Sequence, residues 1–115
     1  MMRSSAPKHT AMHIDSIILR LRDAVVATSQ EIERLCDELK IPLAPCGGGV
    51  RIKRGHIDEF RLRYTIPRTE ALRDPPYVFL SPLVALMRDR ELYGEVDFEP
   101  NEGDAHITFS FKFNV

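Results

Sequence analysis

The sequence predicts an α+β fold, in which a long N-terminal helix and a shorter second helix pack on an antiparallel sheet of about five strands. Two observations lead to this class. Residues at alternating steps of four and three form one helical face: Ile14, Ile18, Leu21, Val25, Thr28, Ile32, Leu35 and Leu39. Several short segments further along alternate apolar and polar residues, as half-buried strands do. The expected order of elements is α-β-β-β-α-β-β.

The first helix is expected to begin near Ile14–Ser16 and to stop before Pro42, whose ring cannot continue a helix. A helix of about 26 residues is about 39 Å long. This length is large for a chain of 115 residues, so the helix needs a large sheet or a partner chain to pack on. Residues 1–13 are interpreted as a flexible N-terminal extension, and residues 14–115 as a single domain.

Two strands follow a turn region that contains Pro42, Pro45 and Cys46–Gly49. Residues 50–54 and 60–66 both alternate apolar and polar residues, with a short connection around Gly55–Asp58. The simplest arrangement of two such neighbours is an antiparallel hairpin.

The second half of the chain supplies the remaining elements. A polar loop covers residues 67–76, and Tyr77–Leu80 is expected to be a third strand, apolar on both faces. Ser81 and Pro82 indicate the start of the second helix, at residues 83–92. Strands at residues 95–99 and 107–115 close the chain, and the last of these has the strongest alternation in the protein.

The bulk composition excludes some classes of protein. The chain has 43% hydrophobic and 29% charged residues and a net charge of −1, which argues against a nucleic acid partner. No apolar run is long enough for a membrane span, and the first twelve residues do not form a secretory signal. With only two cysteines there is no disulfide framework, and we expect a cytoplasmic protein.

Four basic residues are expected on one side of the predicted hairpin: Arg51, Lys53, Arg61 and Arg63. Such a basic strand face could bind phosphate or an acidic protein segment. The alternative, which we favour, is that these side chains pair across the sheet with Glu95, Asp97 and Glu99.

The sequence contains no arrangement that indicates catalysis. Cys46-Gly47-Gly48-Gly49 lacks the strand, helix and Lys-Ser/Thr of a phosphate-binding loop. Cys36, Cys46, His56 and His106 contain no short-spaced pair of metal ligands, and no Ser-His-Asp arrangement can be assigned. We therefore expect no catalytic residue, no metal and no cofactor, and an enzyme is the less favoured interpretation.

The first helix carries apolar residues on a second side as well. Leu19 and Val26 lie away from the main helical face, and Ile17 and Ala27 extend the strip. A helix that packs only on its own sheet needs one apolar face, and exposed apolar strips are rare in monomers. We therefore predict a homodimer with this strip at its interface.

Residues 50–62, Val-Arg-Ile-Lys-Arg-Gly-His-Ile-Asp-Glu-Phe-Arg-Leu, resemble the strand–glycine–strand unit of the trypsin-co-occurring domains. The resemblance covers roughly a tenth of the chain. It implies a small module of one helix and several strands with an adaptor role in bacterial conflict systems. This chain differs in its inserted second helix and its longer first helix.

Two functions remain open from the sequence. The favoured one is a non-enzymatic protein-interaction module, such as a small adaptor, inhibitor or assembly protein, that acts as a homo-oligomer. The alternative is a small ligand-binding or catalytic domain with a pocket between helix and sheet that uses Arg61, Arg63 or His106.

Overall fold

The structure has the expected α+β architecture, with four strands in its sheet. The computed structural model describes residues 5–71 and 78–114, and side chains from Asp15 onward within these ranges. The elements in chain order are α1 (Ser5–Glu38), β1 (Ala44–Lys53), β2 (His56–Ile66), α2 (Arg68–Ala71), α3 (Leu80–Asp89), β3 (Gly94–Glu99) and β4 (Ala105–Lys112).

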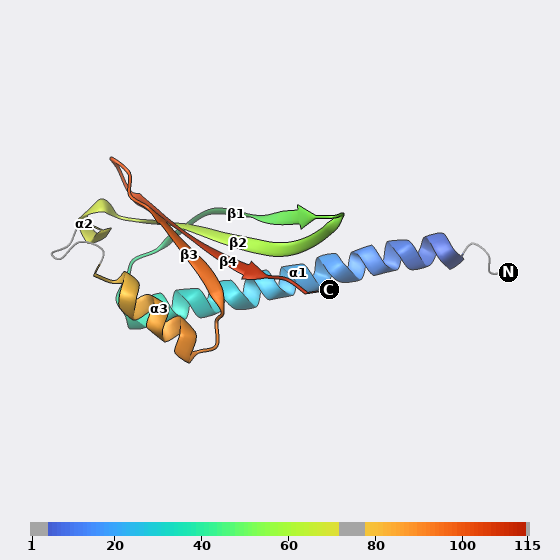
Figure 1. Cartoon of the computed structure of the whole chain (residues 1–115), viewed down its shortest axis with the longest axis horizontal. Coiled ribbons are helices and arrows are strands. Elements are labelled where there is room, and N and C mark those ends of the chain that lie inside the picture. The colour runs from blue at the N-terminus through green and yellow to red at the C-terminus, as the bar shows by residue number, and fades with distance from the viewer. Residues whose placement is uncertain (1–4, 72–77, 115) are drawn as a thin grey trace.

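The sheet has the strand order β1-β2-β4-β3, and all neighbouring strands are antiparallel. Strands β2 and β4 are therefore central, while β1 and β3 form the two edges. Helix α1 lies along one face of the sheet and extends past it at its N-terminal end (Figure 1). The molecule is accordingly elongated, measuring 69 × 30 × 21 Å.

The expected hairpin of β1 and β2 is confirmed. Lys53 pairs with His56, and the two residues between them, Arg54 and Gly55, have φ angles of 53° and 78°. Two positive φ angles in a two-residue loop match the right-handed twist of the strands that the loop joins. This turn carries the hairpin well beyond the centre of the sheet, alongside the N-terminal half of α1 (Figure 1).

The core lies between the inner faces of the two central strands and the C-terminal half of α1. Phe60, Leu62, Tyr64 and Ile66 of β2 alternate inward, as do Ile107, Phe109 and Phe111 of β4. The aromatic rings are in direct contact: Phe60 stacks on Phe111 with 5.6 Å between ring centroids, and Tyr64 meets Phe109 edge to face at 5.8 Å. From the helices, Ile32, Leu35, Cys36, Leu83 and Met87 complete this core.

The predicted face of the first helix packs on the core from Leu21 to Leu39, and among the described side chains it departs from the prediction at Ile18. Ile32 and Leu35 are fully buried, whereas Ile18 is half exposed and Ile17 packs against the core in its place. A seven-residue repeat drifts about 20° per repeat around a straight helix of 3.6 residues per turn. Over the two repeats from Ile32 to Ile18, this drift turns the apolar row away from the sheet.

Three expectations about element boundaries need correction. Helix α1 begins at Ser5 and not near Ile14–Ser16 as expected, so residues 5–13 are helical. The expected strand at Tyr77–Leu80 is wrong where the chain is described: Val78 and Phe79 form a turn and Leu80 begins α3, while Tyr77 lies outside the described residues. A fifth strand is therefore not part of the sheet. A short helix, α2, lies in the segment predicted as a loop.

A fourth correction concerns Cys46–Gly49, which is part of strand β1 and not a flexible turn. Cys46 has no paired residue on β2, because the register shifts between Pro45 and Gly47. A Cβ atom added to Gly48 would come within 2.5 Å of the carbonyl oxygen of Arg61, so a glycine allows the two strands to approach at this point.

The aromatic packing leads to a first prediction. Phe109→Ala removes a ring with 0% exposure and leaves a cavity against Tyr64, so the free energy of unfolding should fall by about 3–5 kcal/mol. Urea denaturation measures this loss. Tyr93→Ala, at a largely exposed ring, is the control and should change it by less than about 0.5 kcal/mol. A loss below about 1 kcal/mol for Phe109→Ala would contradict the described core.

The core also predicts a loss of stability in alkaline solution. Burial, followed by the charges of Asp37 and Glu33, raises the pKa of Cys36 from 9.0 to about 12. Burial and the charge of Glu33 likewise raise the pKa of Tyr64 from 10.0 to about 12. Because both groups have a higher pKa in the folded state, their full contribution is present below pH 9 and is lost as the pH rises toward 12.

The midpoint of urea denaturation should therefore fall between pH 9 and pH 11. Tyr64→Phe, which has no ionisable hydroxyl, should show a smaller decrease above pH 10 than the wild type. An identical pH dependence in the two proteins would contradict the assignment to Tyr64.

Candidate functional site

The first candidate surface is a set of exposed apolar residues on α1, which the exposed Arg22 interrupts between Ile18 and Val26. Ile18, Leu19 and Val26, which we call the α1 flank, are 53%, 49% and 48% exposed. Of the other two residues predicted for this strip, Ile17 packs partly against the core, and Ala27 is exposed. The structure therefore leaves Leu19, Val26 and Ala27 of the predicted strip exposed and adds Ile18.

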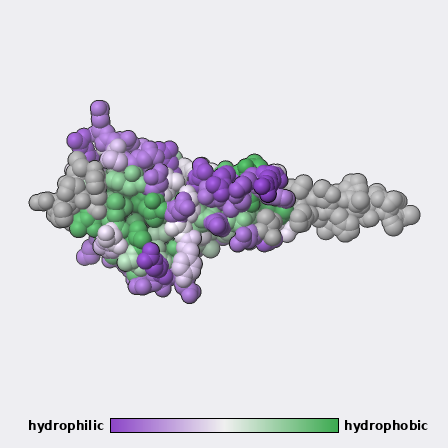
Figure 2. All heavy atoms as spheres, viewed as in Figure 1, coloured by the Kyte–Doolittle hydropathy of each residue, from purple (hydrophilic) through white to green (hydrophobic). Residues whose placement is uncertain are grey.

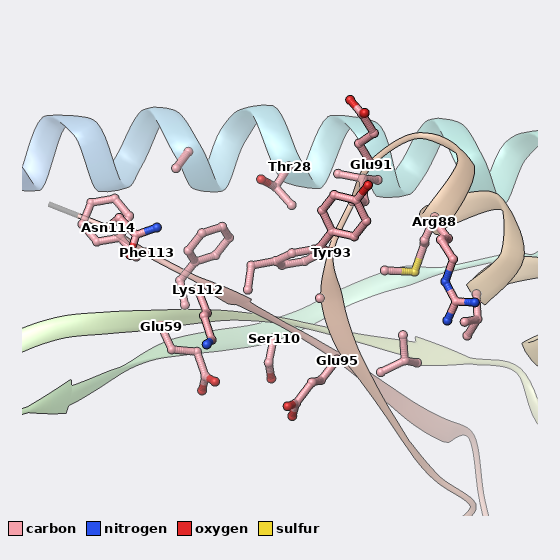
Figure 3. A pocket seen from close by; sticks show the side chains of 18 of the residues that line it. Thr28, Glu59, Arg88, Glu91, Tyr93, Glu95, Ser110, Lys112, Phe113 and Asn114 are labelled. Carbon is pink, nitrogen blue, oxygen red and sulfur yellow. The ribbon is translucent and has the colours of Figure 1, made fainter.

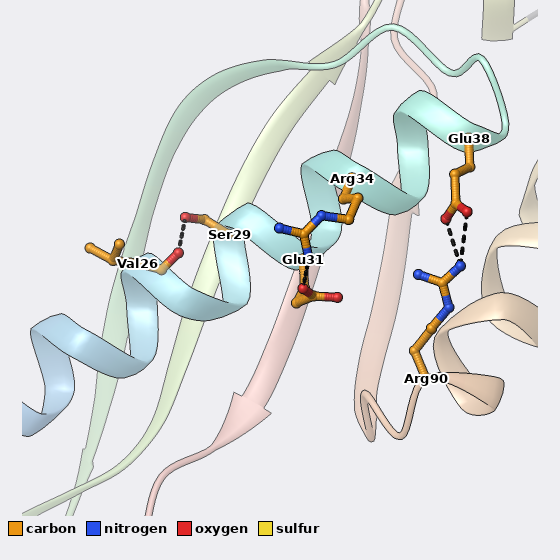
Figure 4. A network of polar contacts seen from close by, with 6 residues as sticks. All are labelled: Val26, Ser29, Glu31, Arg34, Glu38 and Arg90. Carbon is orange, nitrogen blue, oxygen red and sulfur yellow. Dashed lines mark hydrogen bonds and ion pairs between the residues drawn. The ribbon is translucent and has the colours of Figure 1, made fainter.

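The α1 flank lies on the β1–β2 side of the molecule. On the other side of α1, Arg20 donates a hydrogen bond to the carbonyl oxygen of Asn114, and Glu38 forms an ion pair with Arg90, the residue after α3 (Figure 4). Glu33 follows Val26 by seven residues, so it lies on the same side of the helix as the flank. Its charge helps to raise the pKa of Tyr64, which places this side of α1 near β2. The flank therefore faces away from α3 and toward the β1 edge.

Strand β1 adds two more exposed apolar residues on this side. Val50 pairs with the inward-facing Phe60, and Ile52 pairs with Ile57, so both point to the inner face of the sheet. They are nevertheless 42% and 66% exposed, because β1 lies at the edge, beyond the part of the sheet that α1 covers. All ten residues of β1 are exposed.

The outer face of the sheet is polar and forms the second candidate surface. A shallow groove of about 770 Å³ runs across it, from the glycines of β1 to the acidic residues of β3. The polar groups that line this groove differ from strand to strand. Strand β2 contributes Arg61 and Arg63, β4 contributes the hydroxyls of Thr108 and Ser110, and β3 contributes Glu95, Asp97 and Glu99. Hydrophilic residues also gather over the free end of the β1–β2 hairpin (Figure 2).

Two arginines of the predicted basic strand face are held by carboxylates. Arg51 donates two hydrogen bonds to Asp58, at 3.1 and 2.9 Å. Asp58 has no pairing partner on β1 because of a register shift, and its hydrogen bond with Arg51 lowers the pKa of its carboxyl group. Glu59 lies 3.0 Å from Arg61 and 3.9 Å from Arg51, so this glutamate joins the two arginines into one network.

The expected ion pairs between β2 and β3 are not seen in the described part of the chain. Strand β4 lies between these strands: Arg63 is opposite Thr108, which is in turn opposite Asp97. Arg61 binds Glu59 on its own strand instead. Lys53 lies at the hairpin turn and is exposed. The sequence placed Arg61 and Arg63 correctly on one exposed face but could not give the strand order.

A cavity of about 1070 Å³ lies between α1, α3 and the start of β3 (Figure 3). Its floor is apolar and includes Phe60, Met87, Leu92, Phe111 and Phe113. Charged residues of both signs surround it: Arg20, Asp23, Glu59, Arg88, Glu91, Glu95 and Lys112. The side chains of Glu59 and Glu95 point away from α1 (Figure 3), so these carboxylates lie at the outer rim.

This cavity does not contain the residues that the sequence suggested for a pocket. Arg61, Arg63 and His106 all lie on the opposite face of the sheet, since their neighbours Phe60, Leu62 and Ile107 point to the core. Its described lining includes neither a histidine nor a cysteine. A mixed-charge rim around an apolar floor can bind a ligand, but nothing in it forms a pair of nucleophile and base.

The residues considered as metal ligands are dispersed. Cys36 is buried in the core, Cys46 is exposed on β1, and His106 contacts Asn101 through its ring nitrogen at 2.6 Å. Within the described ranges, no three His, Cys, Asp or Glu residues are grouped as a metal site would require. Similarly, the helices in these ranges are not long and apolar enough to cross a membrane.

Comparison of the chain with protein-family models, with curated proteins and with solved structures gives no match. The resemblance of residues 50–62 to the trypsin-co-occurring domains is thus not supported by a family model. A function can therefore be inferred only from the geometry and chemistry of the candidate surfaces.

Sequence reasoning missed the cavity beside α3 and the open edge of β1. The cavity arises from residues of five elements and their connections, and no short motif connects them. The sequence does contain a pattern at the edge strand β1: Val50 and Ile52 alternate with basic residues and directly follow the glycine segment. This pattern could have extended the predicted strand back into the glycines.

The arginine network predicts that the basic strand face contributes little to stability. Arg61 and its partner Glu59 are at the surface, and Arg61 is about half exposed, so the ion pair should contribute only about 0–1 kcal/mol. The double variant Arg61→Ala plus Arg63→Ala should therefore keep its thermal midpoint within a few degrees of the wild type, measured by circular dichroism. A decrease of more than about 8 °C would show that these side chains have a structural role.

Proposed function

We propose that this protein is a non-enzymatic protein-interaction module that acts as a homodimer through the α1 flank. The observation that carries the proposal is the half exposure of Ile18, Leu19 and Val26 on the outside of a regular helix. Burying three such side chains would stabilise a complex by several kcal/mol, at about 25 cal/mol per Å² of apolar surface.

The shape of the chain supports the same proposal. Helix α1 has 34 residues, about 51 Å, and from Asp15 onward, where its side chains are described, the fully buried ones lie in its C-terminal half. Exposed apolar side chains arranged along one rigid helix fit a partner that is also elongated. A second copy of the chain offers the same strip, and two-fold symmetric pairing of identical patches is the commonest form of self-association.

An adaptor, inhibitor or assembly protein needs a surface and a stable scaffold, and it needs no catalytic group. The polar outer face of the sheet would remain open in a dimer formed through α1, because it lies on the opposite side of the sheet. It could then bind an acidic segment of another protein at Arg63, whose neighbours across the sheet are Gly47 and Thr108.

Sedimentation velocity over a range from nanomolar to micromolar concentration tests the homodimer. The wild type should sediment as a dimer at micromolar concentration, and Leu19→Glu plus Val26→Glu should sediment as a folded monomer, because four charges would be buried at one interface. The matched control is Val84→Glu plus Tyr93→Glu, which places the same charges at exposed apolar residues elsewhere and should remain dimeric.

A wild type that is monomeric throughout this range would contradict the homodimer. If the wild type is dimeric and both double variants stay dimeric, the interface lies outside the α1 flank, and that part of the proposal is wrong.

A further inference from the structure

We infer that two copies of the chain join their β1 strands edge to edge in antiparallel orientation, so that the two sheets become continuous. This inference rests on the proposed homodimer and gives its geometry. In such a dimer the two α1 helices lie on the same face of the eight-stranded sheet, and their flanks face each other beneath the joined edges.

The first argument is that the edge of β1 is open. Within the described structure β1 pairs with β2 alone, so one row of its backbone N–H and C=O groups has no strand beside it. Proteins usually protect such an edge with proline, with a bulge or with a charge that points inward. Strand β1 has Pro45 and the unpaired Cys46 near its start, but from Gly47 to Arg51 its pairing is regular and its inward residue is Val50.

The glycines make this stretch accessible to another strand. Gly47 and Gly49 face the outer side of the sheet, and a Cβ atom added to either would meet no atom within 4 Å, so this face of the strand is uncovered. A second β1 strand could approach without any side chain of these residues in its way. The opposite edge of the sheet is different, because β3 carries Glu95, Asp97 and Glu99, and two copies of it would place like charges side by side.

The second argument is that the exposed apolar residues lie where this pairing would bury them. Val50 and Ile52 point to the inner face of β1, and the α1 flank faces the same side of the molecule. A second copy placed against the β1 edge covers Val50 and Ile52, and it lies next to Ile18, the flank residue that is nearest to the sheet-facing side of α1. An interface through α1 alone would leave Ile52 in water.

The third argument is charge complementarity, which selects the antiparallel orientation. Lys53 and Arg54, at the hairpin turn, lie beside the N-terminal half of α1 (Figure 1), and both are exposed. Glu33 and Asp37 lie near the C-terminal end of α1, on the side of the flank, and are exposed as well. A two-fold axis perpendicular to the sheet brings the basic turn of each copy toward the acidic end of the other, whereas a parallel arrangement would bring like charges together.

Lysine substitutions on β1 test this geometry by sedimentation velocity. Val50→Lys plus Ile52→Lys adds two inward charges at exposed positions and should weaken the dimer at least about 100-fold, which is about 2.7 kcal/mol. Glu95→Lys is the control, because it changes the net charge by the same two units at the opposite edge and should leave the dimer unchanged. Circular dichroism establishes that each variant is folded.

A distance measurement tests the register without any change to β1. Cys46 is exposed, while Cys36 is buried and its thiol has a pKa raised to about 12, so a spin label attaches to Cys46. If the pairing is centred near Gly49, the two Cys46 residues are six residues apart along the joined strands, or about 20 Å. Pulsed electron paramagnetic resonance should then give a distribution of distances between the two labels of about 20 to 35 Å, which includes the length of the labels.

The outcomes separate this inference from the proposed function. A dimer that dissociates on Val50→Lys plus Ile52→Lys and shows the short distance supports the joined sheets. A dimer that resists these lysines but dissociates on Leu19→Glu plus Val26→Glu overturns the joined sheets and leaves the homodimer intact. A distance distribution centred well beyond 35 Å also overturns them, and a monomeric wild type overturns both.

Discussion

The structure depends on one contact: the inner faces of β2 and β4 pack on the C-terminal half of α1. The central strands supply a continuous row of large apolar side chains, and Ile32 and Leu35 cover them with no remaining exposure. The other elements are placed by this contact. Helix α3 is held against the same core by Leu83 and Met87, and its end is tied to α1 by the ion pair between Arg90 and Glu38 (Figure 4). The edge strands take their positions from hydrogen bonds to β2 and β4.

One helix is too narrow to cover four strands, so two areas on the inner face of the sheet are left uncovered by α1. Toward β3, α3 fills part of the uncovered area and leaves the cavity between the helices. Toward β1, none of the described elements fills it, so Val50 and Ile52 stay exposed beside the α1 flank. The asymmetry explains why the two sides differ in chemistry. The cavity is rimmed by charges of both signs, whereas the flank is apolar apart from Arg22 and lies between a basic turn and an acidic helix end.

The fold class, both helices and four of the strands could be predicted because each has a local cause. Alternation over β2 and β4, the stop before Pro42 and the turn at Gly55 are all features of neighbouring residues. The errors arose where a distant partner decides the structure. Val78, Phe79 and Leu80 have strand propensity, but the first two form a turn and Leu80 begins a helix that packs on the core. Cys46–Gly49 has loop propensity but is held in the sheet by β2. The apolar row turns away from the sheet at Ile18 because the helix is straight. The spacing of the apolar residues does not specify whether a helix is straight or supercoiled.

The candidate site was predictable only in part, for the same reason. Leu19 and Val26 could be assigned to a second face because helical geometry fixes their direction. The function of Arg61 and Arg63 could not be assigned, because it depends on which strand lies beside β2, and β4 rather than β3 occupies that place. The strand order also decides which edge is open. With β4 in the centre, the acidic strand β3 and the glycine-containing strand β1 become the two edges of the sheet. Two copies of β3 side by side would bring like charges together, whereas two copies of β1 would not do so at their glycines. Strand order thus connects the packing of the core with the surface that is available for association.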